Sequence, residues 1–366
     1  MKVAIDVGPT HGRRTGIGNA VAWTIEALRE RDADGIGFYL TSVRARTRDG
    51  ERRLPIPAAV ALRLWSHRSP PMDRWLGTPD VVHGTNYVVP PARCARVVSV
   101  YDCWFLEHPE DAEPDVQRAA AVLRRAVADG AHVVTSSDAT TRRVRDLLGT
   151  DLVRTILLGP PRRIETGDAR RTSSHRSIIP ELDGQTFVLA LGTMERRKNL
   201  PTLVSAFGRL AHEHESVRLV MAGAAANDTG AVDRAIARLQ PEIAARIVRT
   251  GPVDEVTKQW LLSNARTLAY PSLDEGFGFP ILEAQQTGTP VVASTAGSIP
   301  QIAGAAALLS PARDAEALAA NLYWIVTNDE MHAKLVRRGH TNVQRFSWAS
   351  TATRLTDTYA EVADAH

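Results

Sequence analysis

Two glutamates bracket a glycine-rich turn in the second half of the chain, Glu275-Gly-Phe-Gly-Phe-Pro-Ile-Leu-Glu283. The segment follows an expected strand and opens an expected helix at Pro280, a residue favoured in the first helical turn. Gly278 lets the backbone approach a ligand closely, and the N–H groups near Gly278 and Phe279 suit an anion such as phosphate. Glu283, one turn inside the helix, can reach a polyol such as ribose, while Glu275 lies on the loop before it. The competing interpretation is a Gly-Pro loop with two surface glutamates.

A second polar segment, Gly192-Thr-Met-Glu-Arg-Arg-Lys-Asn199, lies between another expected strand and the next helix. Arg197 and Lys198 would there face the same strand edge as the glycine-rich turn. Two cations and a helix N-terminus can neutralise a diphosphate without a metal ion. Three adjacent cations are also typical of an ordinary solvated turn, and that alternative stays open.

A third segment, from Gly12 to Asn19, connects the first expected strand to the first helix and contains Gly16-Ile17-Gly18. Its spacing departs from the dinucleotide fingerprint, because Val21 stands where a third glycine is required. An NAD-dependent oxidoreductase would also have an acidic residue at the end of the second strand, which here ends in Thr41-Ser42. The loop is therefore interpreted as a wall that faces an anion.

Short apolar runs alternate with amphipathic helices along the chain, which is typical of parallel sheets covered on both faces. The expected strands are residues 3–7, 36–40, 81–83, 97–101, 132–135, 153–158, 187–191, 218–221, 247–250, 267–270 and 290–293. An Arg- and Ser-rich stretch from Pro160 to Gly184 indicates a linker. We expect two doubly wound, Rossmann-like α/β domains facing across a cleft: an acceptor domain, residues 1–165, and a donor domain, residues 166–346. A last helix, residues 347–366, would cross back to the first domain.

The combination of segments resembles the retaining GT-B glycosyltransferases, most closely family four, which use nucleotide-sugar donors. Glu275 to Glu283 resembles that family's paired-glutamate motif, and Gly192 to Asn199 resembles its GTLEPRKN element. The resemblance implies that Glu283 holds the donor ribose and that Glu275 contacts hydroxyls of the donor sugar. It also implies that Arg197 and Lys198 bind the diphosphate.

The likeness extends over nearly the whole chain, since residues 16–18, 80–87, 298–304 and 346–348 match further family elements. Tyr101-Asp102 stands where the family often has His-Asp, so this chain has tyrosine in place of that histidine. Gln301 replaces a usual glutamate, and Arg196 replaces a usual proline. The loop around Val253 is expected to decide which nucleotide base is bound.

The expected activity is transfer of a sugar from a nucleoside diphosphate sugar to an acceptor hydroxyl, with retention and without a metal ion or cofactor. Glu275, Arg197 and Lys198 would stabilise the transition state, and Asp102 is an alternative base. A nucleotide-sugar epimerase or hydrolase on the same fold is the nearest alternative, and a catalytically silent binding protein is another. No His or Cys cluster has metal-ligand spacing, and His11, His83 and His108 are read as isolated.

The charge balance is small, with 44 Lys+Arg against 41 Asp+Glu, and gives no reason to expect nucleic-acid binding. Only Cys94 and Cys103 are present, which excludes a disulfide framework. The chain opens without a signal-like apolar run, so we expect a cytoplasmic protein. The apolar and basic stretch from Ala58 to Trp75, which includes Trp65 and Arg68, suits either a core helix, the favoured reading, or contact with a membrane or lipid-linked acceptor. Glycans and small molecules remain alternative acceptors.

Overall fold

The computed structural model describes residues 1–12, 15–31, 35–67, 69–162 and 179–366. Contacts divide the chain into unit 1, which comprises Met1–Gly159 and Phe346–His366, and unit 2, which comprises Pro160–Arg345. The expected boundaries were one at residues 165/166 and one at 346/347. Arg13 and Arg14 of the first glycine loop, Arg68, and most of the expected Arg- and Ser-rich linker, residues 163–178, lie outside the described residues.

Unit 1 is built on a seven-stranded parallel sheet in the order β3-β2-β1-β4-β5-β6-β7. Its strands are β1 (Val3–Asp6), β2 (Ile36–Thr41), β3 (Glu51–Leu54), β4 (Val81–Gly84), β5 (Ala95–Val100), β6 (His132–Thr135) and β7 (Val153–Thr155). The helices are α1 (Gly16–Glu30), α2 (Ala58–Trp65), α3 (Asp73–Leu76), α4 (Trp104–Glu107), α5 (Pro114–Ala128), α6 (Asp138–Leu148) and α15 (Trp348–Asp364), with 3₁₀ turns η1 (Gly8–Thr10) and η2 (Pro109–Asp111).

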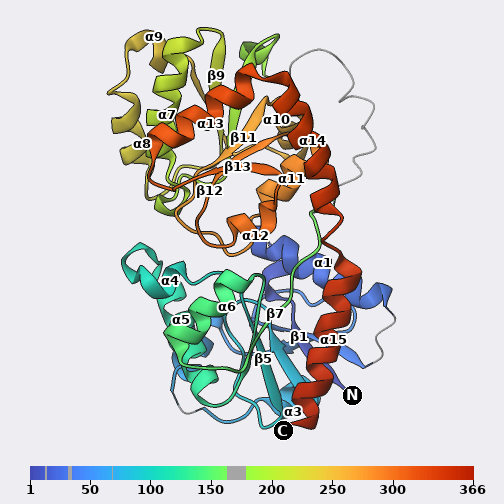
Figure 1. The fold of residues 1–366 in the computed structure, drawn as a ribbon. Coiled ribbons are helices and arrows are strands. Elements are labelled where there is room, and N and C mark those ends of the chain that lie inside the picture. The colour runs from blue at the N-terminus through green and yellow to red at the C-terminus, as the bar shows by residue number, and fades with distance from the viewer. Residues whose placement is uncertain (13–14, 32–34, 68, 163–178) are drawn as a thin grey trace. The chain divides into compact units, whose positions relative to one another are not determined.

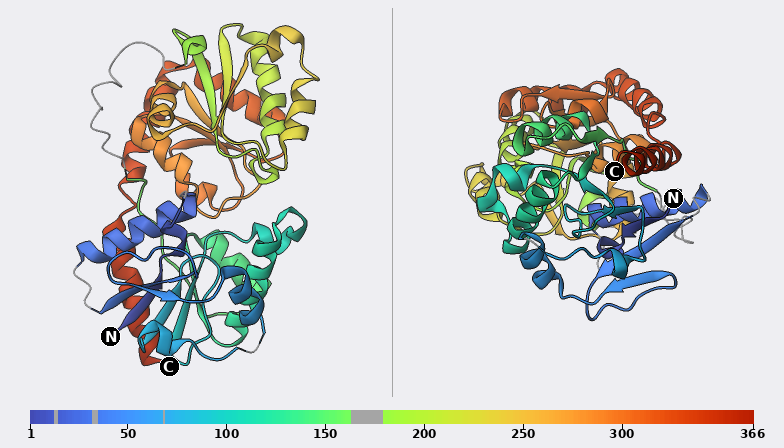
Figure 2. Two further views of the ribbon diagram at one scale, coloured as in Figure 1. Left: turned by 180° about the vertical axis from the view of Figure 1, so that it is seen from behind. Right: turned by 90° about the horizontal axis from the view of Figure 1, so that it is seen from below.

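The last helix, α15, packs within unit 1 against α1, β4 and β5, and both chain ends lie on this unit (Figure 1, Figure 2). Trp348 at its start lies 5.7 Å, ring to ring, from Trp23. Deeper along the helix, the hydroxyl of Tyr359 lies 2.6 Å from Nδ1 of His83, and Nε2 of His83 lies 2.8 Å from Oγ of Ser99. Burial lowers the pKa of His83 to about 3, so the ring is neutral.

Unit 2 is built on a six-stranded parallel sheet in the order β10-β9-β8-β11-β12-β13. Its strands are β8 (Thr186–Leu191), β9 (Val217–Ala222), β10 (Ile247–Gly251), β11 (Thr267–Tyr270), β12 (Val291–Ser294) and β13 (Ala307–Ser310). The helices are α7 (Leu200–Glu213), α8 (Thr229–Ile236), α9 (Pro241–Ala244), α10 (Glu255–Asn264), α11 (Phe279–Thr287), α12 (Ile299–Ala303), α13 (Ala315–Thr327) and α14 (Asp329–Val343), with 3₁₀ turns η3 (Pro180–Leu182) and η4 (Arg196–Lys198).

Each sheet face of unit 2 packs on its own apolar core, as expected for continuous Val/Ile/Leu strands. The prediction of two doubly wound parallel units is confirmed. The sequence reading missed β3, β13 and the short helices α4, α9 and α12, and it placed the end of β7 too late, at Leu158 instead of Thr155. Within the described ranges, none of the helices has both the length and the apolar character needed to span a bilayer.

Candidate active site

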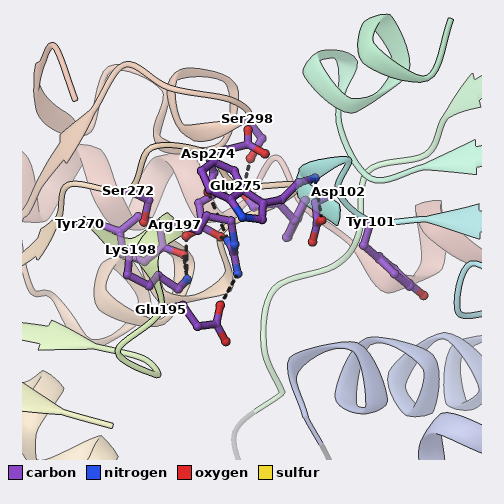
Figure 3. A network of polar contacts seen from close by, with 12 residues as sticks. Tyr101, Asp102, Glu195, Arg197, Lys198, Tyr270, Ser272, Asp274, Glu275 and Ser298 are labelled. Carbon is purple, nitrogen blue, oxygen red and sulfur yellow. Dashed lines mark hydrogen bonds and ion pairs between the residues drawn. The ribbon is translucent and has the colours of Figure 1, made fainter. Parts of the chain in front are cut away.

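A buried glutamate holds two cations at the carboxyl edge of the unit 2 sheet (Figure 3). Strands β8 and β11 are neighbours, so the segments that follow them meet at one edge. The segment after β8 supplies Arg197 and Lys198, and the segment after β11 supplies Glu275. Nη1 of Arg197 lies 2.5 Å from Oε2 of Glu275, and Nζ of Lys198 lies 2.6 Å from Oε1. Each carboxylate oxygen therefore has its own cation.

The electrostatics of this trio are those of a tightly paired, partly dehydrated site. Glu275 is only 6% exposed, so the interpretation of a surface glutamate at this position was wrong. Burial alone would raise the pKa of Glu275, but Arg197 and Lys198 outweigh it and lower the pKa to about 2. Burial also lowers the pKa of Lys198, and the nearby carboxylate only partly opposes that effect.

Surrounding groups fix the positions of both cations. Nζ of Lys198 donates to the hydroxyl of Tyr270, at 3.2 Å, and lies 5.0 Å from the centre of the same ring. Nη1 of Arg197 donates to the carbonyl oxygen of Asp274, at 3.2 Å, and Nη2 lies 3.4 Å from Oε2 of Glu195. The four charged side chains are therefore two cations and two carboxylates, preorganised before any ligand binds.

The turn that carries the cations is held by Asn199. This residue has a left-handed backbone, with φ of 54°, and ends η4. Its side-chain Nδ2 donates to the carbonyl oxygens of Pro271, at 2.9 Å, and Ala312, at 2.5 Å. An asparagine accepts a left-handed backbone more readily than most residues, so it can reverse the chain and bind the neighbouring loops together.

The glutamate loop leaves no space for a side chain at Gly297. A Cβ there would lie 2.4 Å from Oδ1 of Asp274 and within 2.8 Å of the backbone of Glu275. The next residue reinforces the contact, because the backbone N–H of Ser298 donates to the carbonyl oxygen of Glu275 and its Oγ donates to the carbonyl oxygen of Phe277. Two loops thus hold Glu275 in place.

Helix α11 begins directly after this loop. Gly278 precedes it with φ of 103°, a conformation that favours glycine, and contributes no side-chain cap; Phe279 is the first helical residue. The start of the helix is therefore suited to an anion, as expected from the sequence.

Glu283 pairs with a different cation from the two that contact Glu275. Nζ of Lys258, on α10, lies 2.7 Å from Oε1 of Glu283 and 2.9 Å from Oε1 of Glu255. Burial opposes the charge on Lys258, but the two carboxylates raise its pKa overall. Val253, the residue expected to border the base, is half-buried and packs against the unit 2 core.

The remaining expected residues lie in unit 1. Gly16, Ile17 and Gly18 form the first turn of α1, where Oγ1 of Thr15 accepts from the backbone N–H of Gly18 at 3.3 Å. Asp102 follows β5, and its carboxylate accepts from the hydroxyl of Tyr87, at 3.3 Å, and from the backbone N–H of Trp104, at 3.2 Å.

Tyr101 precedes Asp102 and is half-buried, and this burial raises the pKa of its hydroxyl. The reading of His108 as isolated was wrong, because its ligand atoms lie within 4.8 Å of those of Glu110 and Asp111. Nδ1 of His108 is 3.3 Å from the Glu110 carboxylate.

Sequence reasoning missed several residues that shape the cation site, notably Lys258, Tyr270 and Asn199. Asn199 had a usable signal, because an Asn directly before a helix is typical of a chain reversal. Tyr270 ends β11 and contacts Lys198, which follows β8. Lys258 and Glu283 lie on different helices. Both contacts join residues that are far apart in sequence, so they are visible only in the folded structure.

Comparison with known proteins finds glycosyltransferases similar to this chain. The family described as "Glycosyl transferases group 1" matches residues 185–328, all within unit 2. The chain is 27% identical to O-antigen chain mannosyltransferase B of Escherichia coli over 76% of this chain and 74% of that protein. It is 29% identical to phosphatidyl-myo-inositol mannosyltransferase of Mycolicibacterium smegmatis over 50% of this chain and 47% of that protein.

A D-inositol 3-phosphate glycosyltransferase of Corynebacterium urealyticum is 25% identical over 70% of this chain and 62% of that protein. The matches therefore cover 74%, 62% and 47% of the lengths of these three relatives.

Solved structures share the complete two-unit fold. Sucrose-phosphate synthase from Thermosynechococcus elongatus has a TM-score of 0.71 at 18% identity, over 100% of both chains. Anabaena HepE, solved with UDP and glucose, has a TM-score of 0.68 at 16% identity, over 99% of this chain and 100% of that one. WaaG, a glycosyltransferase of lipopolysaccharide biosynthesis, has a TM-score of 0.69 at 15% identity, over 97% and 98%. The chain has the GT-B fold of these glycosyltransferase structures, and its residues 185–328 match the glycosyl transferases group 1 family.

Proposed function

We propose that the chain transfers a hexosyl group from a nucleoside diphosphate sugar to an acceptor hydroxyl, with retention of the anomeric configuration. The observation that supports this most directly is the buried pairing of Arg197 and Lys198 with Glu275 beside the start of α11. Breaking the bond to the donor sugar leaves a diphosphate whose negative charge grows as the reaction proceeds. Two preorganised cations and a helix N-terminus stabilise that charge without moving.

Glu275 has two tasks in this proposal. In the ligand-free site it holds the cations, and with the donor bound it contacts the sugar hydroxyls and favours the positive charge that develops at the anomeric carbon. A diphosphate would compete with Glu275 for Arg197 and Lys198. Glu283 would similarly exchange its contact with Lys258 for the donor ribose, next to Val253 and the base.

The acceptor proton can pass to an oxygen of the departing phosphate, in which case no protein base is needed. Asp102 remains the alternative base. In unit 1, the first turn of α1 at Gly16, Ile17 and Gly18 would supply backbone N–H groups to the donor.

The first test is a thermal-shift screen with UDP, GDP, ADP and TDP, since a nucleotide present at 100 times its dissociation constant stabilises by about 2.7 kcal/mol. UDP is the first candidate, because the HepE structure contains it. Turnover is then measured with the sugar esters of the nucleotide that binds. Lys198→Ala should reduce kcat at least 100-fold, as expected when one charge-stabilising group is removed. Arg196→Ala, an exposed change in the same turn, is the matched control and should stay near wild type.

We also propose that transfer is independent of metal ions and of any cofactor. The sequence does contain one Asp-x-Asp triplet, Asp32-Ala33-Asp34, a type of motif found in metal-dependent transferases. These residues lie outside the described part of the chain. Activity that persists in EDTA supports the proposal, and activity restored only by Mn²⁺ or Mg²⁺ contradicts it.

The alternative of an epimerase or hydrolase uses the same donor site without an acceptor. The curated relatives named above are transferases, which favours transfer. Consumption of the donor at the same rate with and without an acceptor would support the alternative instead. A peripheral membrane contact by the stretch from Ala58 to Trp75 is a separate proposal, supported by the exposure of Leu64 (49%) and Trp75 (56%). Co-sedimentation with anionic vesicles tests it.

A further inference from the structure

Two carboxylates share one ammonium group where α10 packs against α11. Nζ of Lys258 lies 2.7 Å from Oε1 of Glu283 and 2.9 Å from Oε1 of Glu255. The arrangement is the reverse of that at Glu275, where one carboxylate holds two cations. A cation with two partners can give up one of them and remain paired. The Lys258 cluster, which consists of Lys258, Glu255 and Glu283, is therefore suited to release a carboxylate.

The start of α10 places Glu255 and Lys258 beside each other. The side chain of Asp254 caps the helix by accepting from the backbone N–H of Thr257, at 2.8 Å. Glu255 is the first helical residue and Lys258 follows three residues later, a spacing that brings two side chains to one face of a helix. Helix α10 follows β10 and α11 follows β11, so both begin at the carboxyl edge of the sheet. Parallel sheets bind their ligands at this edge.

The members of the Lys258 cluster differ in how far they are covered. The side chain of Glu255 is 34% exposed, that of Lys258 is 23% exposed and that of Glu283 is 16% exposed. Water can therefore replace a lost partner of Lys258 only in part, and a cation that is largely covered and unpaired costs free energy. Lys258 thus needs one carboxylate at all times, and Glu255 can supply it when Glu283 turns away.

The contact of Lys258 with Glu283 opposes the capture of a ribose. The 2′ and 3′ hydroxyl groups of ribose both donate hydrogen bonds, and a carboxylate can accept one through each of its two oxygens. In the ligand-free site Lys258 already occupies Oε1 of Glu283. The free energy of ribose binding therefore includes the cost of loosening this contact. That cost is smaller when Lys258 keeps its second carboxylate.

We propose that Glu255 is a positioning residue for ribose capture: it holds Lys258 while Glu283 exchanges the ammonium group for the two ribose hydroxyls. This inference rests on the proposed function, in which Glu283 holds the donor ribose. Glu255 does not contact the nucleotide in this role, and it acts only by keeping Lys258 paired. An ordinary Glu-Lys pair of a helix would stabilise α10 without affecting the recognition of ribose.

Calorimetric titration with UDP, GDP and ADP, and with the 2′,3′-dideoxy form of each, tests the proposal. The measured quantity is the ribose ratio, which is the dissociation constant of the dideoxy form divided by that of the ribonucleotide. Contributions of the base and the diphosphate cancel in this ratio. For the ribonucleotide that the wild-type chain binds, the ratio should be about ten or more, as expected for hydrogen bonds to a charged group.

Two variants should change the ribose ratio in opposite directions. Glu255→Gln removes the second carboxylate from Lys258, so Glu283 is released less readily and the ratio should fall about threefold, the size expected for a partly exposed ion pair. Lys258→Met removes the competing ammonium group, so the ratio should rise by a similar factor. Glu242→Gln is the matched control, because Glu242 also lies in the first turn of a unit 2 helix but is exposed, and it should keep the wild-type ratio.

The proposal is overturned if Glu255→Gln has the same ribose ratio as Glu242→Gln, even if its Tm is lower, or if Glu255→Gln and Lys258→Met shift the ratio in the same direction. Donor turnover is measured in parallel. Turnover with a wild-type ribose ratio near one, or without ribonucleotide binding, refutes the role of Glu255 and leaves sugar transfer standing. If no ribonucleotide binds and no donor is turned over, the proposed function fails and this inference fails with it.

Discussion

Replacing Glu275 by glutamine removes a negative charge from between two cations and keeps the size of the side chain. Pairing lowers the pKa of Glu275 from 4.5 to about 2, and at 1.36 kcal/mol per unit this corresponds to about 3 kcal/mol of stability at neutral pH. Removal of one partner from a buried ion pair generally costs about 3–5 kcal/mol of stability, which agrees with this value. For a unit of this size each kcal/mol lowers Tm by about 2–4 °C, so Glu275→Gln should unfold about 6–12 °C below wild type.

Scanning calorimetry provides the measurement, and Glu195→Gln is the matched control. Glu195 contacts the same Arg197 at 3.4 Å but its side chain is 41% exposed, so its loss should cost less than about 1 kcal/mol. Because the pKa of Glu275 is lower in the folded state, its stabilisation is complete above pH 4.5 and disappears as pH falls toward 2. The difference in Tm between wild type and Glu275→Gln should therefore become smaller as the pH falls from 4.5 toward 2. The reasoning would be refuted if the two variants lowered Tm equally, or if the difference in Tm stayed constant down to pH 3.

Three further changes test other parts of the structure. Below pH 6.5 the unfolded chain binds a proton at His83 that the buried ring, with pKa about 3, does not bind, so the free energy of unfolding falls by about 1.4 kcal/mol per pH unit. His83→Gln should remove this loss of stability. Urea unfolding at pH 7 and pH 5 measures it. Gly297→Ala should lower donor turnover at least tenfold by displacing the glutamate loop, whereas Gly184→Ala, at a glycine of similar positive φ with open space around it, should leave turnover near wild type. Gly159→Ala should destabilise unit 1 by about 1–3 kcal/mol in denaturant unfolding, since its Cβ would lie 2.4 Å from the indole of Trp348; an unchanged midpoint would show that the helix relaxes freely.

The parallel sheets could be predicted because buried strands carry continuous apolar runs, as in β8. Strand β3 has the sequence Glu-Arg-Arg-Leu and lies at the edge of the described sheet, beside β2. An edge strand can carry charged side chains, so a search for apolar runs does not find it. Strand β13 lies in an uncharged stretch where strand and helix patterns are hard to separate.

The candidate site was predicted in its residue types but not in its pairings. Arg197 and Lys198 are 78 and 77 residues from Glu275 in sequence, and only the neighbouring positions of β8 and β11 bring them together. The partnership of Glu283 with Lys258 depends in the same way on the packing of α10 against α11. Burial of Glu275 could not be predicted, because isolated glutamates are rarely buried and the compensating cations lie far along the chain.

The path of the chain affects how the protein emerges from the ribosome. Unit 1 needs α15, yet the 186 residues of unit 2, from 160 to 345, are translated between β7 and that helix. At about 5–20 residues per second, the surface of β4, β5 and α1 that α15 covers waits about 10–40 s for its partner. Unit 2 is continuous in sequence and can complete its sheet first, so the N-terminal part of the nascent chain is the part that most needs protection by a chaperone during synthesis.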